Sequence, residues 1–108
     1  MSDGIEETNY RMNRETTMTH DPITDLLTER GKTYGPFVDQ AATSQALKDT
    51  LRDGARWGSL TSDMAEALEL MAMKMSRIVH GNPSHLDSWD DIAGYARLVA
   101  DRLRGVVR

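Results

Sequence analysis

Apolar or small residues recur every three or four positions in four stretches of this chain, which is the spacing of one face of an α-helix. No stretch shows sustained alternation of apolar and polar residues bounded by turns, so no β-sheet is expected. The residues that define the four stretches are Ile23, Leu26 and Leu27; Phe37, Ala41, Ser44, Leu47, Leu51 and Ala55; Met64, Leu68, Met71, Met75 and Ile78; and Ile92, Tyr95, Ala96, Val99 and Leu103. The pattern predicts an all-α fold: a four-helix, bundle-like single domain over residues 21–108.

Helix-breaking residues place the first two boundaries. Asp21 followed by Pro22 is typical of a helix start, because the carboxylate can cap free N–H groups and proline fits the first helical position. Gly31 is the predicted end of this first helix, with residues 32–36 as a connector. The second helix is expected to begin at Phe37 and to run to about Arg56.

Two capping patterns place the last two helices. Asp63 with Glu66 three residues later predicts the start of the third helix, and Ser88 with Asp91 predicts the start of the fourth. Between them, residues 81–83 (Gly-Asn-Pro) interrupt the chain.

Residues 1–20 are polar and lack apolar periodicity, so they cannot bury enough surface to offset the entropy of ordering. We expect an N-terminal arm that is flexible or held by a partner subunit.

Composition narrows the class of protein. A chain of 108 residues forms one domain, and it has no cysteine for disulfides or thiolate metal sites. It has no apolar run of the roughly 20 residues that span a bilayer and no signal segment, so no membrane association and a cytoplasmic location are expected.

The net charge of -4 argues against nucleic-acid binding, which needs a positive surface field. The exception is a run of C-terminal arginines at positions 97, 102, 104 and 108, which we interpret as a solvated helix end in preference to a nucleic-acid patch.

Charged residues gather on the third and fourth helices. At 100° per residue, Glu66 and Arg77 lie opposite the methionine stripe, with Glu69 and Lys74 beside them. Taken alone, this arrangement is better explained as a solvated helix face than as a site, because the spacings form no clean set of i, i+4 ion pairs. The methionines themselves favour core packing over a cofactor site.

The fourth helix opens with three carboxylates, Asp87, Asp90 and Asp91. The helix dipole is a sufficient structural reason for them, but carboxylates so placed also suit magnesium, and Lys74 and Arg77 could then neutralise phosphate oxygens in the same groove. His80 and His85 match no recurrent zinc spacing. Trp89 is either a helix-start anchor or an aromatic lid over a base.

Three sequence blocks carry a resemblance: residues 29–35 (ERGKTYG), 74–77 (KMSR) and 82–96 (NPSHLDSWDDIAGYA). They resemble a family of small phage and prophage domains from about residue 23 to residue 99. That family is similar in turn to the MazG-like all-α NTP pyrophosphohydrolases, in which a four-helix core holds magnesium on an acidic helix pair and cleaves a nucleoside triphosphate to monophosphate and pyrophosphate.

The resemblance implies a site. Glu66 and Glu69 fill the role of the first acidic helix, and Asp87 with Asp90 or Asp91 fills that of the second. The second pair lacks the glutamate of the MazG pattern, and Lys74 and Arg77 stand where that family requires no cation.

On this basis the magnesium ligands are expected among the five carboxylates, with three of them, Glu66, Asp87 and Asp91, as catalytic groups. The expected substrate- or phosphate-binding residues are Lys74, Arg77, Arg30, Lys32, Tyr34 and His85. A helix end and a tight turn are the structural alternative for residues 30–34. The resemblance also implies a homodimer or larger homo-oligomer.

The leading hypothesis is a phage-encoded protein that binds a nucleotide or its phosphates, with magnesium-dependent NTP pyrophosphohydrolysis as its enzymatic form. The alternative is a non-catalytic phage accessory protein that binds a host protein or sequesters a nucleotide signal.

Overall fold

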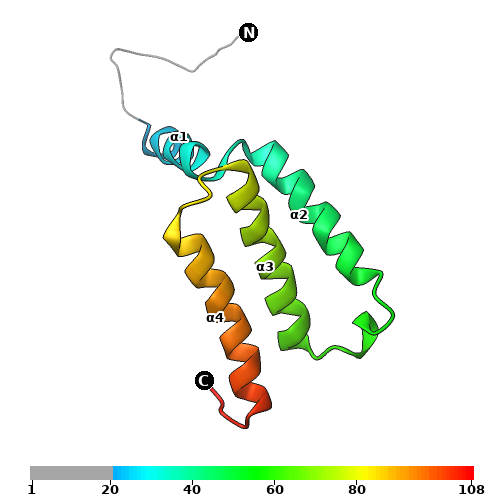
Figure 1. The fold of residues 1–108 in the computed structure, drawn as a ribbon. Helices are drawn as coiled ribbons and strands as arrows, with labels where there is room; N and C mark the ends of the chain where they lie inside the picture. Colours follow the sequence, from blue (N-terminus) through cyan, green and yellow to red (C-terminus); the bar gives the residue numbers. More distant parts are fainter. Residues whose placement is uncertain (1–20) are drawn as a thin grey trace.

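The computed structural model describes residues 21–108, and these residues form four α-helices and no strand (Figure 1). The helices are α1 (Pro22–Tyr34), α2 (Phe37–Arg52), α3 (Ser62–His80) and α4 (Leu86–Leu103), and the short 3-10 helix η1 (Trp57–Ser59) lies between α2 and α3. The predicted all-α single domain is confirmed. The predicted N-terminal arm lies outside the described residues.

Helix α3 is the centre of the fold. It lies between α2 and α4 and runs antiparallel to both, while α1 lies across the end where α3 stops and α4 begins (Figure 1). Short connections dictate this antiparallel order, because a chain that leaves one helix and enters the next within a few residues must fold back alongside it.

The first helix begins where the sequence predicts and ends later. The Ile23 N–H donates to Asp21 Oδ1 at 3.1 Å, and Pro22 occupies the first helical turn. The predicted end at Gly31 is wrong: the helix continues to Tyr34, and Gly35 is its C-cap with φ 81°. A glycine inside a helix costs only about 1 kcal/mol, whereas the Gly-Pro pair at 35–36 cannot continue a helix.

Helix α2 begins at Phe37 as predicted, but three other predicted boundaries need correction. Helix α2 ends at Arg52 instead of near Arg56. Asp63 is not the cap of α3, which begins at Ser62. Ser88 lies buried inside α4, two residues after its start at Leu86.

The side chains of Asp63 and Ser88, which were predicted to cap the helices, have other hydrogen-bond partners. The Asp63 carboxylate accepts hydrogen bonds from Arg102, and the Ser88 hydroxyl lies 3.2 Å from His85 Nδ1. For Asp63 the partner is a residue of another helix, whereas for Ser88 it is His85, three residues earlier in the chain.

Helices α2, α3 and α4 lie side by side in a single layer (Figure 1), and the interior of this layer is small. Among the described residues, the buried apolar side chains are Ala67, Ala72 and Ile78. Ser44 of α2 and Ser76 of α3 are also buried, which fits close packing of helices through small residues. A layer one helix thick cannot enclose large side chains.

Large apolar residues from all four predicted apolar faces are therefore exposed: Ile23, Leu26, Leu27, Phe37, Met75 and Leu103. Phe37 is 76% exposed and Leu103 is 62% exposed. The helical spacing predicts one apolar face on each helix, but the layer leaves much of these faces without a covering element, and α1 buries none of its residues.

None of the helices described here is long and apolar enough to cross a membrane.

Candidate functional site

The ends of α1 and α3 meet through their backbones. The N–H of Asn82 donates to the carbonyl oxygen of Thr33 at 2.6 Å. A Cβ atom added to Gly35 would overlap the carbonyl oxygen of His80, and one added to Gly81 would overlap that of Thr33. Glycine at both positions therefore permits the close approach that places Tyr34 beside the end of α3.

Three side chains surround the Tyr34 ring. The guanidinium carbon Cζ of Arg77 lies 4.4 Å from the ring centroid, and that of Arg30 lies 5.0 Å from it. The His85 ring meets the Tyr34 ring edge-on with centroids 5.4 Å apart. We call these four residues the Tyr34 cluster. Arginine over an aromatic face is a cation–π contact, which holds the guanidinium in place without neutralising it.

Neither arginine of the cluster has a carboxylate partner in the part of the chain that the structure describes. The Nε of Arg77 donates instead to Gln40 Oε1 at 3.4 Å. Lys32, predicted to act with them, lies 3.7 Å from Glu29 in an exposed pair. Two unpaired guanidinium groups against one ring form a local positive site within an acidic protein.

Lys74 and Asp91 bind each other. Their Nζ and Oδ2 atoms are 2.8 Å apart, and the Lys74 side chain is only 13% exposed. The pair joins α3 to α4. Lys74 was predicted to bind phosphate and Asp91 to bind metal, but in the single chain the two side chains form an ion pair with each other.

The five predicted metal ligands do not converge in one chain. Glu69 forms an ion pair with Arg52 of α2, in which the Arg52 Nη2 and Glu69 Oε1 atoms are 2.7 Å apart. Asp91 lies opposite Lys74, which follows Glu66 by eight residues, or about 12 Å along the α3 axis at roughly 1.5 Å per residue.

Asp87 and Asp90 are exposed at the start of α4. The part of the chain that the structure describes contains no group of three or more His, Asp or Glu side chains placed to hold a metal ion. Residues 21–108 of a single chain therefore do not fit a magnesium centre.

Trp89 acts as a helix-start anchor. Its Nε1 donates to the carbonyl oxygen of Pro83 at 2.8 Å, which ties the connector to the first turn of α4. His80, at the end of α3, shares a 2.6 Å hydrogen bond with Thr43 of α2. One hydrogen bond therefore holds the end of α3, and the other holds the connector between α3 and α4.

A family model described as "Domain of unknown function (DUF6378)" matches residues 23–103. The chain belongs to this family. No curated protein and no solved structure matches the chain. The DUF6378 match includes the whole Tyr34 cluster, and it contains no link to phage proteins or to MazG-like enzymes.

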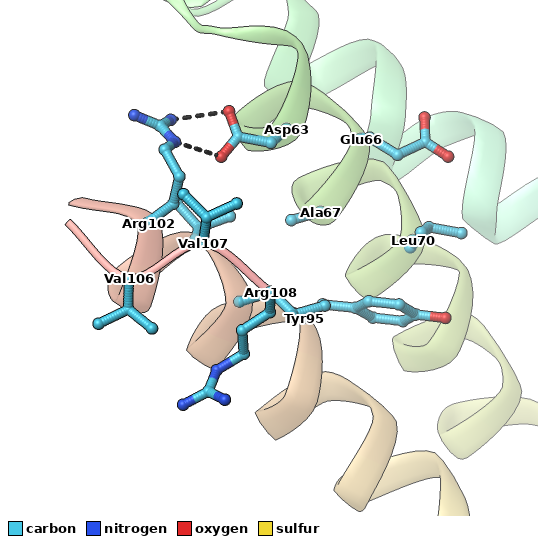
Figure 2. A pocket seen from close by; sticks show the side chains of 11 residues that line it. Asp63, Glu66, Ala67, Leu70, Tyr95, Arg102, Val106, Val107 and Arg108 are labelled. Atoms are coloured by element: carbon cyan, nitrogen blue, oxygen red, sulfur yellow. Dashed lines mark hydrogen bonds and ion pairs between the residues drawn. The ribbon is translucent and has the colours of Figure 1, made fainter. Parts of the chain in front are cut away.

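The DUF6378 domain also has an apolar cavity of about 340 Å³ between α3, α4 and the C-terminal residues (Figure 2). Ala67, Leu70 and Tyr95 line it, and Val106 and Val107 close one side. Sequence reasoning missed this cavity, because the last residues reach it only through the turn at Gly105, which has φ 89°. A glycine after a helical stretch was the available signal.

Two carboxylates, Asp63 and Asp101, form ion pairs with the four C-terminal arginines. The Nη2 and Nε of Arg102 donate to the two oxygens of Asp63 at 2.7 and 2.8 Å (Figure 2). The buried carboxylate of Asp101 accepts from Arg97 at 2.9 Å, from Arg108 at 2.8 Å and from Arg104 at 3.2 Å.

These hydrogen bonds, those from Arg108 and Arg97 foremost, lower the pKa of Asp101 to about 2. Hydrogen bonds from Arg102 and then Thr61 likewise lower the pKa of Asp63 well below its usual range. Three of the four arginines therefore share the carboxylate of Asp101, and the fourth, Arg102, contacts Asp63.

Proposed function

We propose that this DUF6378 protein binds a nucleotide through its phosphates at the Tyr34 cluster. The observation that carries the proposal is the convergence of Arg30 and Arg77 on one tyrosine ring without a carboxylate partner among the described residues. Guanidinium groups bind phosphate oxygens in a bidentate manner, and an anion between two of them relieves their mutual repulsion. Phosphate is the ligand chemistry that this arrangement fits best.

The surroundings of the cluster support a preorganised site. The half-buried Arg77 side chain is oriented by the buried Gln40, and the Tyr34 ring is positioned by the glycine contact between α1 and α3. Side chains held by neighbours lose less entropy when a ligand binds. Arg30 is exposed, so a ligand can approach from its side.

Binding without turnover is the form we propose. The carboxylates that a pyrophosphohydrolase would need are separated in the single chain or paired with cations, as Glu69 is with Arg52 and Asp91 with Lys74. This favours the alternative in which the protein sequesters a nucleotide. The resemblance to phage domains and to MazG-like enzymes supports nucleoside triphosphates as the first ligands to test and an infected cell's cytoplasm as the setting.

The test is isothermal titration calorimetry of the full chain against nucleoside mono-, di- and triphosphates, with and without magnesium. Each mixture is then assayed for released pyrophosphate. We expect affinity to rise with the number of phosphates, and no pyrophosphate. Release of pyrophosphate would contradict sequestration and would favour the hypothesis that the protein is a pyrophosphohydrolase.

Variants locate the site. Arg77→Gln and Arg30→Gln should each weaken binding about 10- to 100-fold, because each removes a charge-assisted contact to phosphate worth roughly 1.5–3 kcal/mol. Arg56→Gln is the matched control, since Arg56 is exposed in the loop before η1 and far from the cluster in the chain. Equal affinity of all three variants, or no binding of any nucleotide by the parent protein, would remove the proposal.

A further inference from the structure

The methionine stripe of α3 faces neither of its neighbours. Contacts mark the two covered edges of this helix: Glu69 pairs with Arg52 of α2, and Lys74 pairs with Asp91 of α4. At 100° per residue, buried Ser76 shares the edge of Glu69, and buried Ala67 shares the edge of Lys74.

The stripe lies between these two edges, on the side of α3 that no described helix covers. It consists of Met64, Leu68, Met71 and Met75 of the predicted stripe, together with Val79. Ile78, the fifth residue of the predicted stripe, lies at its covered edge and is buried. Met75 is 42% exposed and Val79 is 70% exposed. Most of the apolar stripe that the sequence predicts on α3 therefore lies on the open side of the layer, half-buried at Met64, Leu68 and Met71 and exposed at Met75.

Helix α4 contributes to the same face. Ala96 and Val99 line an apolar hollow of about 240 Å³ together with Met64, Leu68 and Met71. Ile92 and Leu103 follow the same helical spacing along α4, and Leu103 is largely exposed. No charged residue lines the hollow. We call the α3 stripe and these α4 residues the apolar face.

From this face we infer a homodimer: a second copy of the chain covers it, so that two helical layers pack face to face. The described part of one chain buries only three apolar side chains, and these are small or medium in size: Ala67, Ala72 and Ile78. Burial of apolar surface is the main force that stabilises a folded domain, so a single layer lacks a sufficient core. A second layer supplies it, and the dimer interface becomes the missing interior.

The dimensions of the face suit this occupant. Helix α3 has 19 residues and α4 has 18, which at roughly 1.5 Å per residue gives a length of about 28 Å. Two adjacent helices are about 20 Å wide. The projected area of the face is then about 560 Å², and the surface that follows its side chains is larger. Stable interfaces bury roughly 600 Å² or more per partner, so the face is large enough. An apolar face without charges matches its own copy across a two-fold axis.

Residues 1–20 are a poorer match to the face. Their apolar residues are few, irregularly spaced and interspersed with charges, so they present no stripe to pair with the one on α3. Arg77 follows Met75 by two residues, which places it about 200° around α3 on the opposite side. The Tyr34 cluster thus stays open in the dimer, and the inference is independent of the proposed nucleotide binding.

Light scattering after size exclusion tests the inference on the full chain. The expected mass is twice the chain mass of 12.1 kDa. The thermal midpoint should rise with protein concentration, because dimerisation and folding are linked. A monomer whose midpoint is independent of concentration would overturn the inference, whatever the nucleotide titrations show, and would make residues 1–20 the next candidate occupant.

Substitutions locate the interface. Met75→Glu should raise the dimer dissociation constant about 100-fold or more, because the symmetry places two carboxylates in an apolar contact. Val38→Glu is the control: Val38 is also exposed, at 77%, but lies in the first turn of α2. Dimers of equal strength in both variants would overturn the assignment of this face.

A milder pair of variants answers the case in which Met75→Glu does not fold. The chain has no cysteine, so Met75→Cys and Val38→Cys each create a single thiol. A flexible bismaleimide should link Met75→Cys into covalent dimers at a concentration at which Val38→Cys stays mostly unlinked. The reverse order, or equal linking, would exclude the apolar face as the interface.

Discussion

Replacing Gly81 by alanine tests the contact that assembles the Tyr34 cluster. A Cβ atom at this position would overlap the Thr33 carbonyl oxygen and would lie 2.5 Å from the carbonyl carbon of Tyr34. Both are backbone atoms of α1, which no side-chain rotation can move away. The ends of α1 and α3 must therefore separate by about 1 Å to restore ordinary contact distances.

The expected cost follows from two effects. Forcing an extra carbon into a close contact costs roughly 1–3 kcal/mol. Separation also strains the 2.6 Å hydrogen bond from Asn82 to Thr33, which is worth about 1 kcal/mol. Gly81→Ala should thus lower the free energy of unfolding by about 2–4 kcal/mol, and the thermal midpoint by roughly 10 °C or more.

Urea unfolding at one fixed protein concentration measures this change, with Gly31→Ala as the control. Gly31 lies inside α1, and nothing lies within 4 Å of the position that its Cβ would occupy. Alanine there should raise the free energy of unfolding by about 0.5–1 kcal/mol, because glycine is the weaker helix former. Opposite signs for the two variants are the prediction. A neutral Gly81→Ala would refute the close approach of α1 and α3.

Two further predictions concern ion pairs. The pKa of the Asp101 carboxyl is about 2 in the folded protein, below its ordinary value of about 4. Between these two pH values the unfolded chain binds more protons than the folded one. The stabilisation from Asp101 is therefore lost as pH falls from about 4 to about 2. Thermal unfolding between pH 5 and pH 2 should show this loss, and Asp101→Asn should flatten the acid side of the curve; an unchanged curve would contradict the reasoning. Asp91→Asn should lower the unfolding free energy by about 1 kcal/mol, since it leaves the mostly covered Lys74 ammonium without its partner, and a double-mutant cycle with Lys74→Met should show coupling. Unchanged stability together with lost nucleotide binding would instead favour the ligand roles that the sequence predicted for this pair.

Local patterns predicted the helices well but not the groups that their side chains meet. The start of α1 follows from Asp21 and Pro22, because a cap and a first-turn proline act within a few residues. Its end does not follow in the same way, since Gly31 and Gly35 are equally good local signals and Pro36 makes the difference. The same holds for Asp63, a plausible cap whose carboxylate is taken by Arg102 from the far end of α4.

The candidate site shows this limit most clearly. The sequence placed Tyr34, Arg77 and Lys74 among the phosphate-binding candidates, and the fold brings Arg77 to the Tyr34 ring but directs Lys74 to Asp91. All three carry the right chemistry for phosphate. Only the rotation and register of α3 against its neighbours decide which cation stays unpaired.

By itself, then, the sequence determined the helical class, the approximate span of each helix and the apolar stripe on α3, because each depends on the 3.6-residue period of one segment. The tertiary structure decided that most of this stripe lies on the open side of the layer and that Glu66, Asp87 and Asp91 do not meet in one chain. The reason is geometric. Periodicity states which residues share a face of a helix, but only the packing of whole helices states which face is covered and which side chains meet across it.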